Sequence, residues 1–407
     1  MANRREFLKA TAAAAVVSQR VLGANDRIRM AVIGTGTRGR IVNTLFRKHA
    51  DCEFVAACDV RESRLGEVVK LIGGKVDSYG DYRRILERKD IDAVLVTTPD
   101  HWHSPVTVDA CAAGKDVYVE KPLSNTIPAA QRMVEAARKY NRVVQLGTQQ
   151  RSGQNFQEAG KLIQDGLLGN ISHAVLFQPG GYTQVTQPAE KPPADLDWEM
   201  FQGPAPRKPY SPSRLRWRSY YDYGGGLVTD WGVHLTDIVM FYLKADSKQP
   251  LLTSASAQYI NFPRDDEQVP DAFTCSWQYD NFVMTFSNLV PPMSGVNAQG
   301  NWFFGQRGVL HINRSGYQVI PTPSRGGRGG QQAPPIQART VPIKEDYEND
   351  PDTTAHARNF LDCVKSRKRS TSDVEIGFNS TLPTLIALLA IQQGRSFRWD
   401  GKAARPA

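Results

Sequence analysis

A glycine-rich run near the N-terminus, GTGTRG at residues 34–39, constrains the fold of this 407-residue chain more than any other feature. It follows directly after the apolar, β-branched segment Ile28–Ile33 and directly before residues 40–49, which have helical periodicity. Gly34 permits a tight turn, Gly36 lets another group approach the backbone, and Gly39 lets helix and strand pack closely. The run therefore predicts a strand–turn–helix unit whose helix N-terminus faces an anionic ligand.

The first 150 residues alternate short apolar runs with helical segments, which is typical of parallel βαβ units. This organisation predicts a Rossmann domain, a doubly wound parallel sheet, over residues 27–150. The predicted strands are Ile28–Ile33 and residues 53–58, 92–98, 116–120 and 143–147, and the predicted helices are residues 40–49, 81–89, 104–113 and 127–140.

Asp59 indicates which ligand the glycine-rich run holds. It ends the second predicted strand, 20 positions after Gly39 (59 − 39). A carboxylate at this place accepts hydrogen bonds from ribose hydroxyls of a dinucleotide and repels a 2′-phosphate. We therefore predict NAD as the cofactor, with NADP as the alternative because Arg61 lies close by.

The rest of the chain has a different pattern, which predicts a second, α+β domain over residues 151–407 with a large, open, mainly antiparallel sheet. A proline-rich stretch occupies residues 188–212. The final helices could pack back on the Rossmann domain. Helices are predicted at residues 156–165, 227–243, 354–365 and 378–393, and strands at Ile171–Phe177 and residues 256–262, 272–279, 282–287 and 309–313.

Composition excludes several classes of function. The five cysteines are scattered with no CxxC pair, and no HExxH occurs, so we predict neither a disulfide framework nor a metal site. The formal charge of +9 invites a nucleic-acid interpretation, but the one RGG-like run, residues 324–330, stands among prolines. We interpret it as a flexible surface loop and predict no nucleic-acid partner.

The N-terminal residues 3–9, NRREFLK, resemble a twin-arginine export motif. The apolar run that follows, residues 10–17, is far shorter than the roughly 20 residues that span a membrane. We predict that residues 1–24 are read by the twin-arginine export machinery and that the protein is periplasmic, without a stable membrane anchor. The alternative is a basic tail on a cytoplasmic protein. Because export would occur in the folded state, we expect the nucleotide to be tightly bound.

Two further motifs extend the pattern. TPDHWH at residues 98–103 is predicted to form a loop, and Glu120-Lys121-Pro122 stands at the carboxyl end of a predicted parallel strand, where ligands bind in open α/β sheets. Together with GTGTRG, these motifs resemble the Gfo/Idh/MocA family, the relatives of glucose–fructose oxidoreductase and inositol dehydrogenase. The resemblance implies that Lys121 lies beside the nicotinamide and the substrate hydroxyl, and that Asp100 replaces a commoner Asn along the cofactor. The predicted cofactor-binding residues are Gly34, Gly36, Thr37, Arg38, Gly39, Asp59, Thr98, Pro99, Asp100, His103, Glu120, Lys121 and Gln149.

A third motif lies in the predicted helix at residues 227–243. Asp230 and His234 are four positions apart and share one helix face, which also carries Asp237. The resemblance implies that His234 is the general acid or base and that Asp230 orients it or contacts substrate hydroxyls. A histidine pKa near 6.5 suits proton transfer at neutral pH. For the substrate we predict contacts from Trp102, Arg151, Tyr223 and Asp237, within a setting of aromatic and basic residues at 216–223 that could equally belong to the core.

The resemblance implies an NAD(P)-dependent oxidoreductase that moves hydride between the nicotinamide and a hydroxyl of a sugar, glycoside or cyclitol. GTQQR at residues 147–151 replaces the Gly-Phe-x-Arg-Arg of inositol dehydrogenases, so substrate identity is not carried over from them. The proline-rich stretch resembles that of the exported bacterial branch of the family, and family analogy implies a homodimer or homotetramer. Two alternatives stay open: a redox-neutral NAD-dependent glycosidase or lyase that oxidises C3 transiently, and a dinucleotide-sensing binding protein without turnover.

Overall fold

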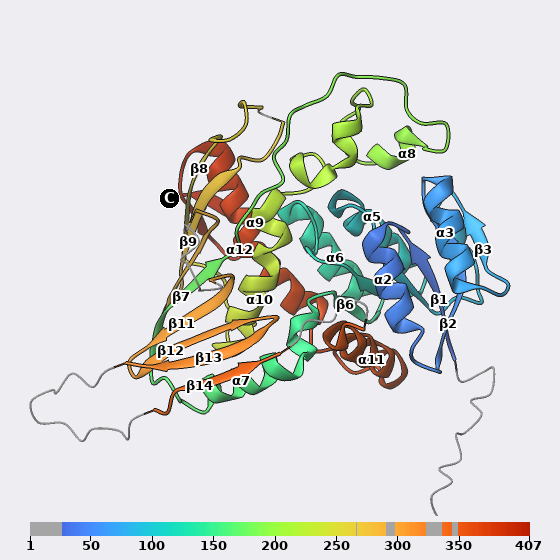
Figure 1. Ribbon diagram of the computed structural model, residues 1–407. Coiled ribbons are helices and arrows are strands. Elements are labelled where there is room, and N and C mark those ends of the chain that lie inside the picture. Colours follow the sequence, from blue (N-terminus) through green and yellow to red (C-terminus); the bar gives the residue numbers. More distant parts are fainter. Residues whose placement is uncertain (1–26, 266, 290–297, 323–335, 344–348) are drawn as a thin grey trace, which may run out of the picture.

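The computed structural model describes residues 27–265, 267–289, 298–322, 336–343 and 349–407. The predicted export segment and the RGG-like run lie outside these ranges. Figure 1 shows two sheets with helices packed between and around them.

The N-terminal sheet begins with β1 (Ile28–Ile33) and has the strand order β3-β2-β1-β4-β5-β6, with every pairing parallel. Chain order reverses between β1 and β4, which is the point where open α/β sheets bind ligands. This confirms the predicted Rossmann architecture. The other elements are β2 (Cys52–Cys58), β3 (Asp77–Tyr79), β4 (Ala93–Val96), β5 (Asp116–Val119), β6 (Val144–Leu146), α2 (Thr37–Phe46), α3 (Glu62–Ile72), α4 (Arg83–Leu86), α5 (Asp100–Ala112) and α6 (Ile127–Lys139).

Four elements of this domain differ from the prediction, the first being the short strand β3, which was not predicted. Helix α3 was missed, because Gly66 in its interior weakens the helical signal that its apolar positions carry. Helix α4 has four residues instead of the predicted nine. Helix α5 begins at Asp100, so residues 100–103 are helical and not a loop; Pro99 precedes the helix, and Pro105 inside it is what made the start seem later.

The second sheet has the strand order β14-β13-β12-β11-β7-β10-β9-β8-β15-β16 and is antiparallel except at β7–β10, which confirms the predicted mainly antiparallel sheet. Its strands are β7 (Ile171–Phe177), β8 (Leu252–Gln258), β9 (Ala272–Gln278), β10 (Val283–Ser287), β11 (Gly300–Gly305), β12 (Gly308–Asn313), β13 (Gly316–Pro321), β14 (Arg339–Pro342), β15 (Phe397–Trp399) and β16 (Ala404–Pro406). The strand predicted at residues 256–262 is in fact β8, which begins earlier.

Helices cover the face of this sheet that looks toward the Rossmann domain (Figure 1). They are α7 (Gln154–Gln164), α9 (Gly226–Asp230), α10 (Gly232–Tyr242) and α12 (Val374–Gln393). Helix α12 is long and apolar enough to cross a membrane, but 72% of its apolar window is buried inside the protein. It is therefore a core helix, and it packs on β8 as well as on α6 of the Rossmann domain.

The last segments connect the two halves. Helix α11 (Pro351–Ser366) packs on α2, where the ring of Phe360 meets that of Phe46 edge-on at 6.0 Å. Residues 178–223, here called the arm, hold α8 (Trp198–Gln202) and run across the open side between the domains (Figure 1). The arm is anchored on the Rossmann domain, because the Asp195 carboxylate accepts hydrogen bonds from Arg61 (3.2 Å) and Ser63 (2.5 Å).

Candidate active site

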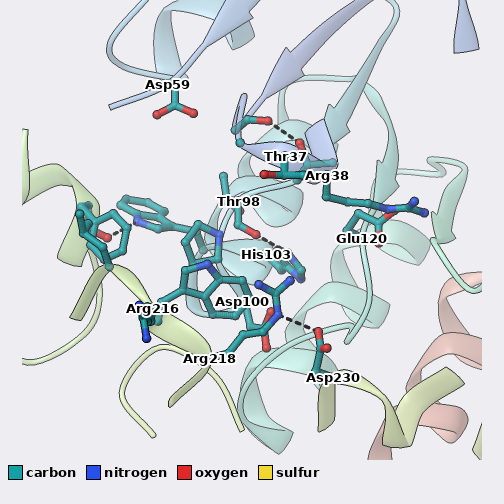
Figure 2. A pocket seen from close by; sticks show the side chains of 18 of the residues that line it. Thr37, Arg38, Asp59, Thr98, Asp100, His103, Glu120, Arg216, Arg218 and Asp230 are labelled. Atoms are coloured by element: carbon teal, nitrogen blue, oxygen red, sulfur yellow. Dashed lines mark hydrogen bonds and ion pairs between the residues drawn. The ribbon is translucent and has the colours of Figure 1, made fainter. Parts of the chain in front are cut away.

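A cavity of about 790 Å³ lies at the switch point of the Rossmann sheet, between that domain, the arm and the α9–α10 segment. Figure 2 shows its side chains: Asp59 and Thr37 lie toward one end, and Arg218 and Asp230 toward the other. Most of the predicted site residues line it. Those lining it are Gly34, Gly36, Thr37, Arg38, Asp59, Thr98, Pro99, Asp100, Trp102, His103, Glu120, Lys121, Gln149, Asp230 and His234.

The glycine-rich turn has the geometry that a dinucleotide backbone requires. Gly34 has φ +91°, and a Cβ there would lie 2.7 Å from the carbonyl carbon of Thr97. A Cβ on Gly39 would lie 2.1 Å from the carbonyl oxygen of Gly34, so this glycine, which does not itself line the cavity, sets how closely α2 approaches β1. A Cβ on Gly36 would meet nothing nearer than 3.7 Å, so this position opens onto the cavity. The residues present therefore fit a pyrophosphate at this turn.

Asp59 is held rigidly at the same end. One carboxylate oxygen accepts hydrogen bonds from the backbone N–H (2.6 Å) and hydroxyl (2.9 Å) of Thr35, and the other accepts from the backbone N–H of Arg61 at 2.9 Å. The Arg61 guanidinium, which motivated NADP as an alternative, is turned toward Asp195 of the arm. Asp59 therefore faces the ribose position with its carboxylate already oriented.

Arg38 and Glu120 form a bridge in the middle of the cavity wall. The Arg38 Nε donates to Glu120 Oε1 at 2.8 Å, and Glu120 is buried. The Arg38 guanidinium also reaches the hydroxyl of Thr353 on α11, at 3.4 Å. Arg38 therefore ties α2 to the end of β5, which fixes the backbone immediately before Lys121.

Lys121 and Asp230 meet at the other end of the cavity. The Lys121 Nζ donates to Asp230 Oδ1 at 2.6 Å and to the Asp230 carbonyl at 2.9 Å. Asp230 also accepts from Arg218 Nε (2.9 Å) and from the hydroxyl of Tyr182 (2.6 Å). Burial opposes its ionisation, but Lys121 and Arg218 outweigh burial and hold the Asp230 pKa well below its usual range. Asp230 is therefore a permanent carboxylate that orients two cations.

His234 lies one helical turn beyond Asp230. The helix predicted at residues 227–243 is divided at Trp231 into α9 and α10, but Trp231 keeps right-handed helical dihedrals, so Asp230 and His234 both face the cavity. The His234 ring packs against that of Trp231 at 5.7 Å, and its Nδ1 is buried with no hydrogen-bond partner among the described residues. Burial, followed by the charges of Lys121 and Arg314, holds the His234 pKa well below its usual value.

Three side chains of the cavity lining have buried oxygen atoms that no described residue binds. Asp100 Oδ1, Thr98 Oγ1 and Gln149 Oε1 are buried without a hydrogen-bond partner in the described part of the chain. Buried polar atoms are normally paired, so these lining residues have capacity that a bound ligand can use. His103 differs, because each of its two ring nitrogens faces a backbone carbonyl oxygen, that of Pro122 at 2.8 Å and that of Thr98 at 3.0 Å.

Three predicted substrate contacts lie outside the cavity lining. Asp237 is one turn of α10 farther than His234, where the helix enters the core; it pairs there with Arg151 at 2.7 Å. Arg151 binds Asp246 as well, so its guanidinium is fully engaged. Tyr223 is completely buried in an aromatic cluster with Trp198 and Phe201. These three predictions are corrected: the residues support the fold around the site.

Three other cavity residues could not be identified from sequence motifs. Tyr182 comes from the arm, and Arg314 from the turn between β12 and β13, each far from any motif. Arg218 falls within the aromatic and basic segment noted in the sequence, but nothing there indicated that it binds Asp230. Among the described residues, no group of three or more His, Cys, Asp or Glu side chains is arranged to hold a metal ion.

Comparisons with known proteins agree with this geometry. Residues 28–148 match a family model described as an oxidoreductase family with an NAD-binding Rossmann fold, and residues 152–281 match the C-terminal alpha/beta domain of the same family. Myo-inositol 2-dehydrogenase of Thermotoga maritima is 32% identical over 35% of this chain and 42% of its own length. A glycosyl hydrolase family 109 protein of Stenotrophomonas maltophilia is 28% identical over 53% of this chain and 50% of its own length. The matches thus span about half or less of these curated relatives.

Solved structures share the fold over nearly the whole chain. Levoglucosan dehydrogenase, in complex with NADH and levoglucosan, superimposes with a TM-score of 0.66 at 17% identity and covers 91% of this chain and 98% of its own. The aldose-aldose oxidoreductase from Caulobacter crescentus, complexed with glycerol, gives 0.65 at 19% identity and covers 92% and 100%. At these identities, the likeness establishes the fold alone.

Proposed function

Since the chain belongs to the Gfo/Idh/MocA oxidoreductase family, we propose that it transfers hydride between NAD and a hydroxyl group of a sugar, glycoside or cyclitol. One observation carries the proposal. Lys121, Asp230 and His234 converge at one end of a single cavity whose other end is formed by the glycine-rich turn and Asp59. A dinucleotide held at the turn would have its other end within reach of this cluster, because both line the same cavity.

The residues of the chain have separate roles in this proposal. The turn at residues 34–39 binds the pyrophosphate and Asp59 the adenosine ribose, while NAD, when bound, supplies the hydride acceptor. His234, whose side chain lines the cavity, takes the proton of the substrate hydroxyl on its imidazole ring. The Lys121 ammonium, oriented by Asp230, stabilises the negative charge that develops on the same oxygen.

The names of the relatives support this substrate class, because they include inositol and levoglucosan dehydrogenases and an aldose-aldose oxidoreductase. The family 109 glycosidase relatives support a second candidate, the redox-neutral glycosidase. Its chemistry uses the same cavity but returns the hydride to the substrate in each turnover.

An activity screen separates these candidates. The purified protein, with its nucleotide content first measured after denaturation, is incubated with NAD and a panel of sugars, cyclitols and p-nitrophenyl glycosides. We expect absorbance at 340 nm to rise with a sugar or cyclitol. Release of nitrophenol without a net change in absorbance at 340 nm would favour the glycosidase instead. Tight NAD binding without turnover of any compound in the panel would favour a binding protein.

The pH dependence of the oxidation follows from the environment of His234. Burial and the neighbouring cations lower the pKa of His234 below the value of an ordinary histidine, which is about 6.5. The neutral imidazole, which is the form that accepts a proton, therefore persists to lower pH. We expect kcat/KM to stay level as the pH falls through 6.5 and to decline only below it. A profile measured from pH 5 to 8 tests this, and an inflection at or above 6.5 would contradict it.

We also propose that the protein is exported through the twin-arginine pathway with NAD tightly bound, and that it forms a homodimer or homotetramer. The paired arginines at residues 4 and 5 support export. The contacts of Asp195 with Arg61 and Ser63, which close the arm over the adenosine end, support retention of the cofactor. Fractionation of cells that express the wild type and an Arg4→Lys, Arg5→Lys variant tests the location.

A further inference from the structure

The reacting end of the cavity carries more positive than negative charge. Lys121 and Arg218 both bind the single carboxylate of Asp230, at 2.6 and 2.9 Å. A third cation, Arg314, lines the same end and lies with its guanidinium 4.9 Å from the centre of the Trp231 ring. No described carboxylate forms an ion pair with Arg314. Among the described residues, Asp230 is the one carboxylate that forms an ion pair with any of these three cations, although the charge of Arg314 also acts on the pKa of Asp352 on α11.

Asp100, the other carboxyl group at this end, does not restore the balance. It is 2% exposed, and its burial, reinforced by the nearby charge of Asp230, outweighs the attraction of Arg218 and raises its pKa well above the usual value. The neutral form is thereby favoured. Two further carboxylates line the cavity: Glu120 forms an ion pair with Arg38, and Asp59 lies at the opposite end, beside the glycine-rich turn.

Arg218 is oriented so that its two terminal guanidinium nitrogens remain available to a ligand. Its Nε donates to Asp230, while the guanidinium lies 4.2 Å from the centre of the Trp217 ring and 5.9 Å from that of Tyr182. Among the described residues, its two terminal nitrogens donate to no protein acceptor. A guanidinium fixed by its Nε and stacked on aromatic rings offers a planar fork that matches a carboxylate. Arg218 lines the cavity, and Figure 2 shows it beside Asp230.

These cations are separate from the cofactor phosphates. The glycine-rich turn has its own cation, Arg64, whose Nη1 is 3.7 Å from the Cβ position of Gly36. In Figure 2, Arg218 lies near Asp230, away from Thr37 in the turn. The charge of Arg218 and Arg314 is therefore available to the substrate.

We propose that the substrate is a sugar acid, a polyhydroxylated compound whose carboxylate is bound by the terminal nitrogens of Arg218 and by Arg314. This rests on the proposed function, because it names the substrate class of the same site. A neutral polyol would leave Arg314 without a counter-charge and the terminal nitrogens of Arg218 without a charged acceptor, whereas a carboxylate supplies that charge and accepts hydrogen bonds from both.

Calorimetric titration of the NAD-loaded protein with matched pairs tests the proposal: D-glucuronate against D-glucose, D-galacturonate against D-galactose, and D-gluconate against D-glucitol. We expect at least one acid to bind tenfold or more tighter than its neutral counterpart, and increasing salt to weaken only the acid. Arg314→Gln is expected to weaken that acid by about ten- to hundredfold, as for the loss of a charge-assisted hydrogen bond. The Arg314→Lys variant should retain part of the affinity for that acid. The control is Arg395→Gln, which changes an exposed arginine outside the cavity and should retain the full affinity.

Turnover of the same pairs is followed by the absorbance at 340 nm. The carboxylate site and the oxidoreductase function can then fail independently of each other. Acid binding that depends on Arg314, without any absorbance change, would support the carboxylate site and remove the oxidoreductase function. Neutral sugars that bind or react as well as the acids, or an Arg314→Gln variant that weakens both alike, would overturn the proposal and leave the oxidoreductase standing. If no acid of the panel binds more tightly than its counterpart, the proposal is likewise overturned.

Discussion

Replacing His234 by alanine is expected to lower kcat of the proposed oxidation by about 10³-fold, within the range that a positioned general base contributes. The imidazole is 5% exposed and held against Trp231, and its free Nδ1 has no partner among the described residues. Neither Lys121 nor Asp230 can take over proton removal, because the first is held in an ion pair and the second is stabilised as a carboxylate by two cations. Initial rates at saturating substrate, measured at 340 nm, give the change in kcat.

The control is His173→Ala on β7, which removes a histidine that bonds Thr285 at 3.0 Å and does not line the cavity. This variant should keep kcat within twofold of the wild type. The NAD content of each variant, measured after denaturation, distinguishes loss of chemistry from loss of cofactor. A His234→Ala protein that binds NAD and turns over at the wild-type rate would exclude His234 as the base.

The Rossmann half of the fold could be predicted because each element carries its own local signal. The β1 bounds agree with the prediction residue for residue, since a mainly apolar run ends at Gly34, whose positive φ is typical of a turn. Where the local signal is weak, prediction failed. Helix α3 is interrupted by Gly66, and β8 consists of small and polar residues of which only Thr253 is buried, so neither shows a clear period.

The short outer strands of the large sheet were missed for a different reason. Strands β14, β15 and β16 have three or four residues each, which is too short for a clear period. Strand β15 pairs with the distant β8, and β16 pairs only with β15. The longer strands β11 and β13 were not predicted either, so the sequence showed only part of this sheet.

The candidate site divides in the same way. Lys121 and Asp230 could be proposed together only through family motifs, and the fold brings them within 2.6 Å across 109 positions of sequence. Tyr182 and Arg314 belong to an arm and a turn that carry no motif, so only the three-dimensional arrangement reveals them. Conversely, Asp237 shares a helix face with His234 but lies beyond the cavity, because periodicity gives direction around a helix and not depth along it.

Substitution of the glycines in the N-terminal run separates folding from cofactor binding. A Cβ on Gly39 would lie 2.1 Å from the Gly34 carbonyl oxygen and 2.7 Å from the hydroxyl oxygen of Thr97, so Gly39→Ala must push α2 away from β1. We expect this variant to lose about 1–3 kcal/mol or more of unfolding free energy, as overpacked sites do. NAD binding should be lost as well, because the helix N-terminus that faces the pyrophosphate moves with α2.

Gly36→Ala is the matched variant, which we expect to weaken NAD binding without changing the stability of the fold. Its Cβ would have 3.7 Å of clearance and would enter the cavity, so the unfolding free energy should stay near the wild-type value while NAD affinity falls at least tenfold. Gly66→Ala in α3, with nothing within 4 Å of its Cβ position, should leave NAD binding unchanged and stabilise the helix slightly. Chemical denaturation without nucleotide and titration with NADH, followed by fluorescence, measure the two quantities. If Gly36→Ala bound NADH as tightly as Gly66→Ala, the pyrophosphate could not lie on this turn, because the added methyl group would occupy the space through which the phosphates approach the backbone.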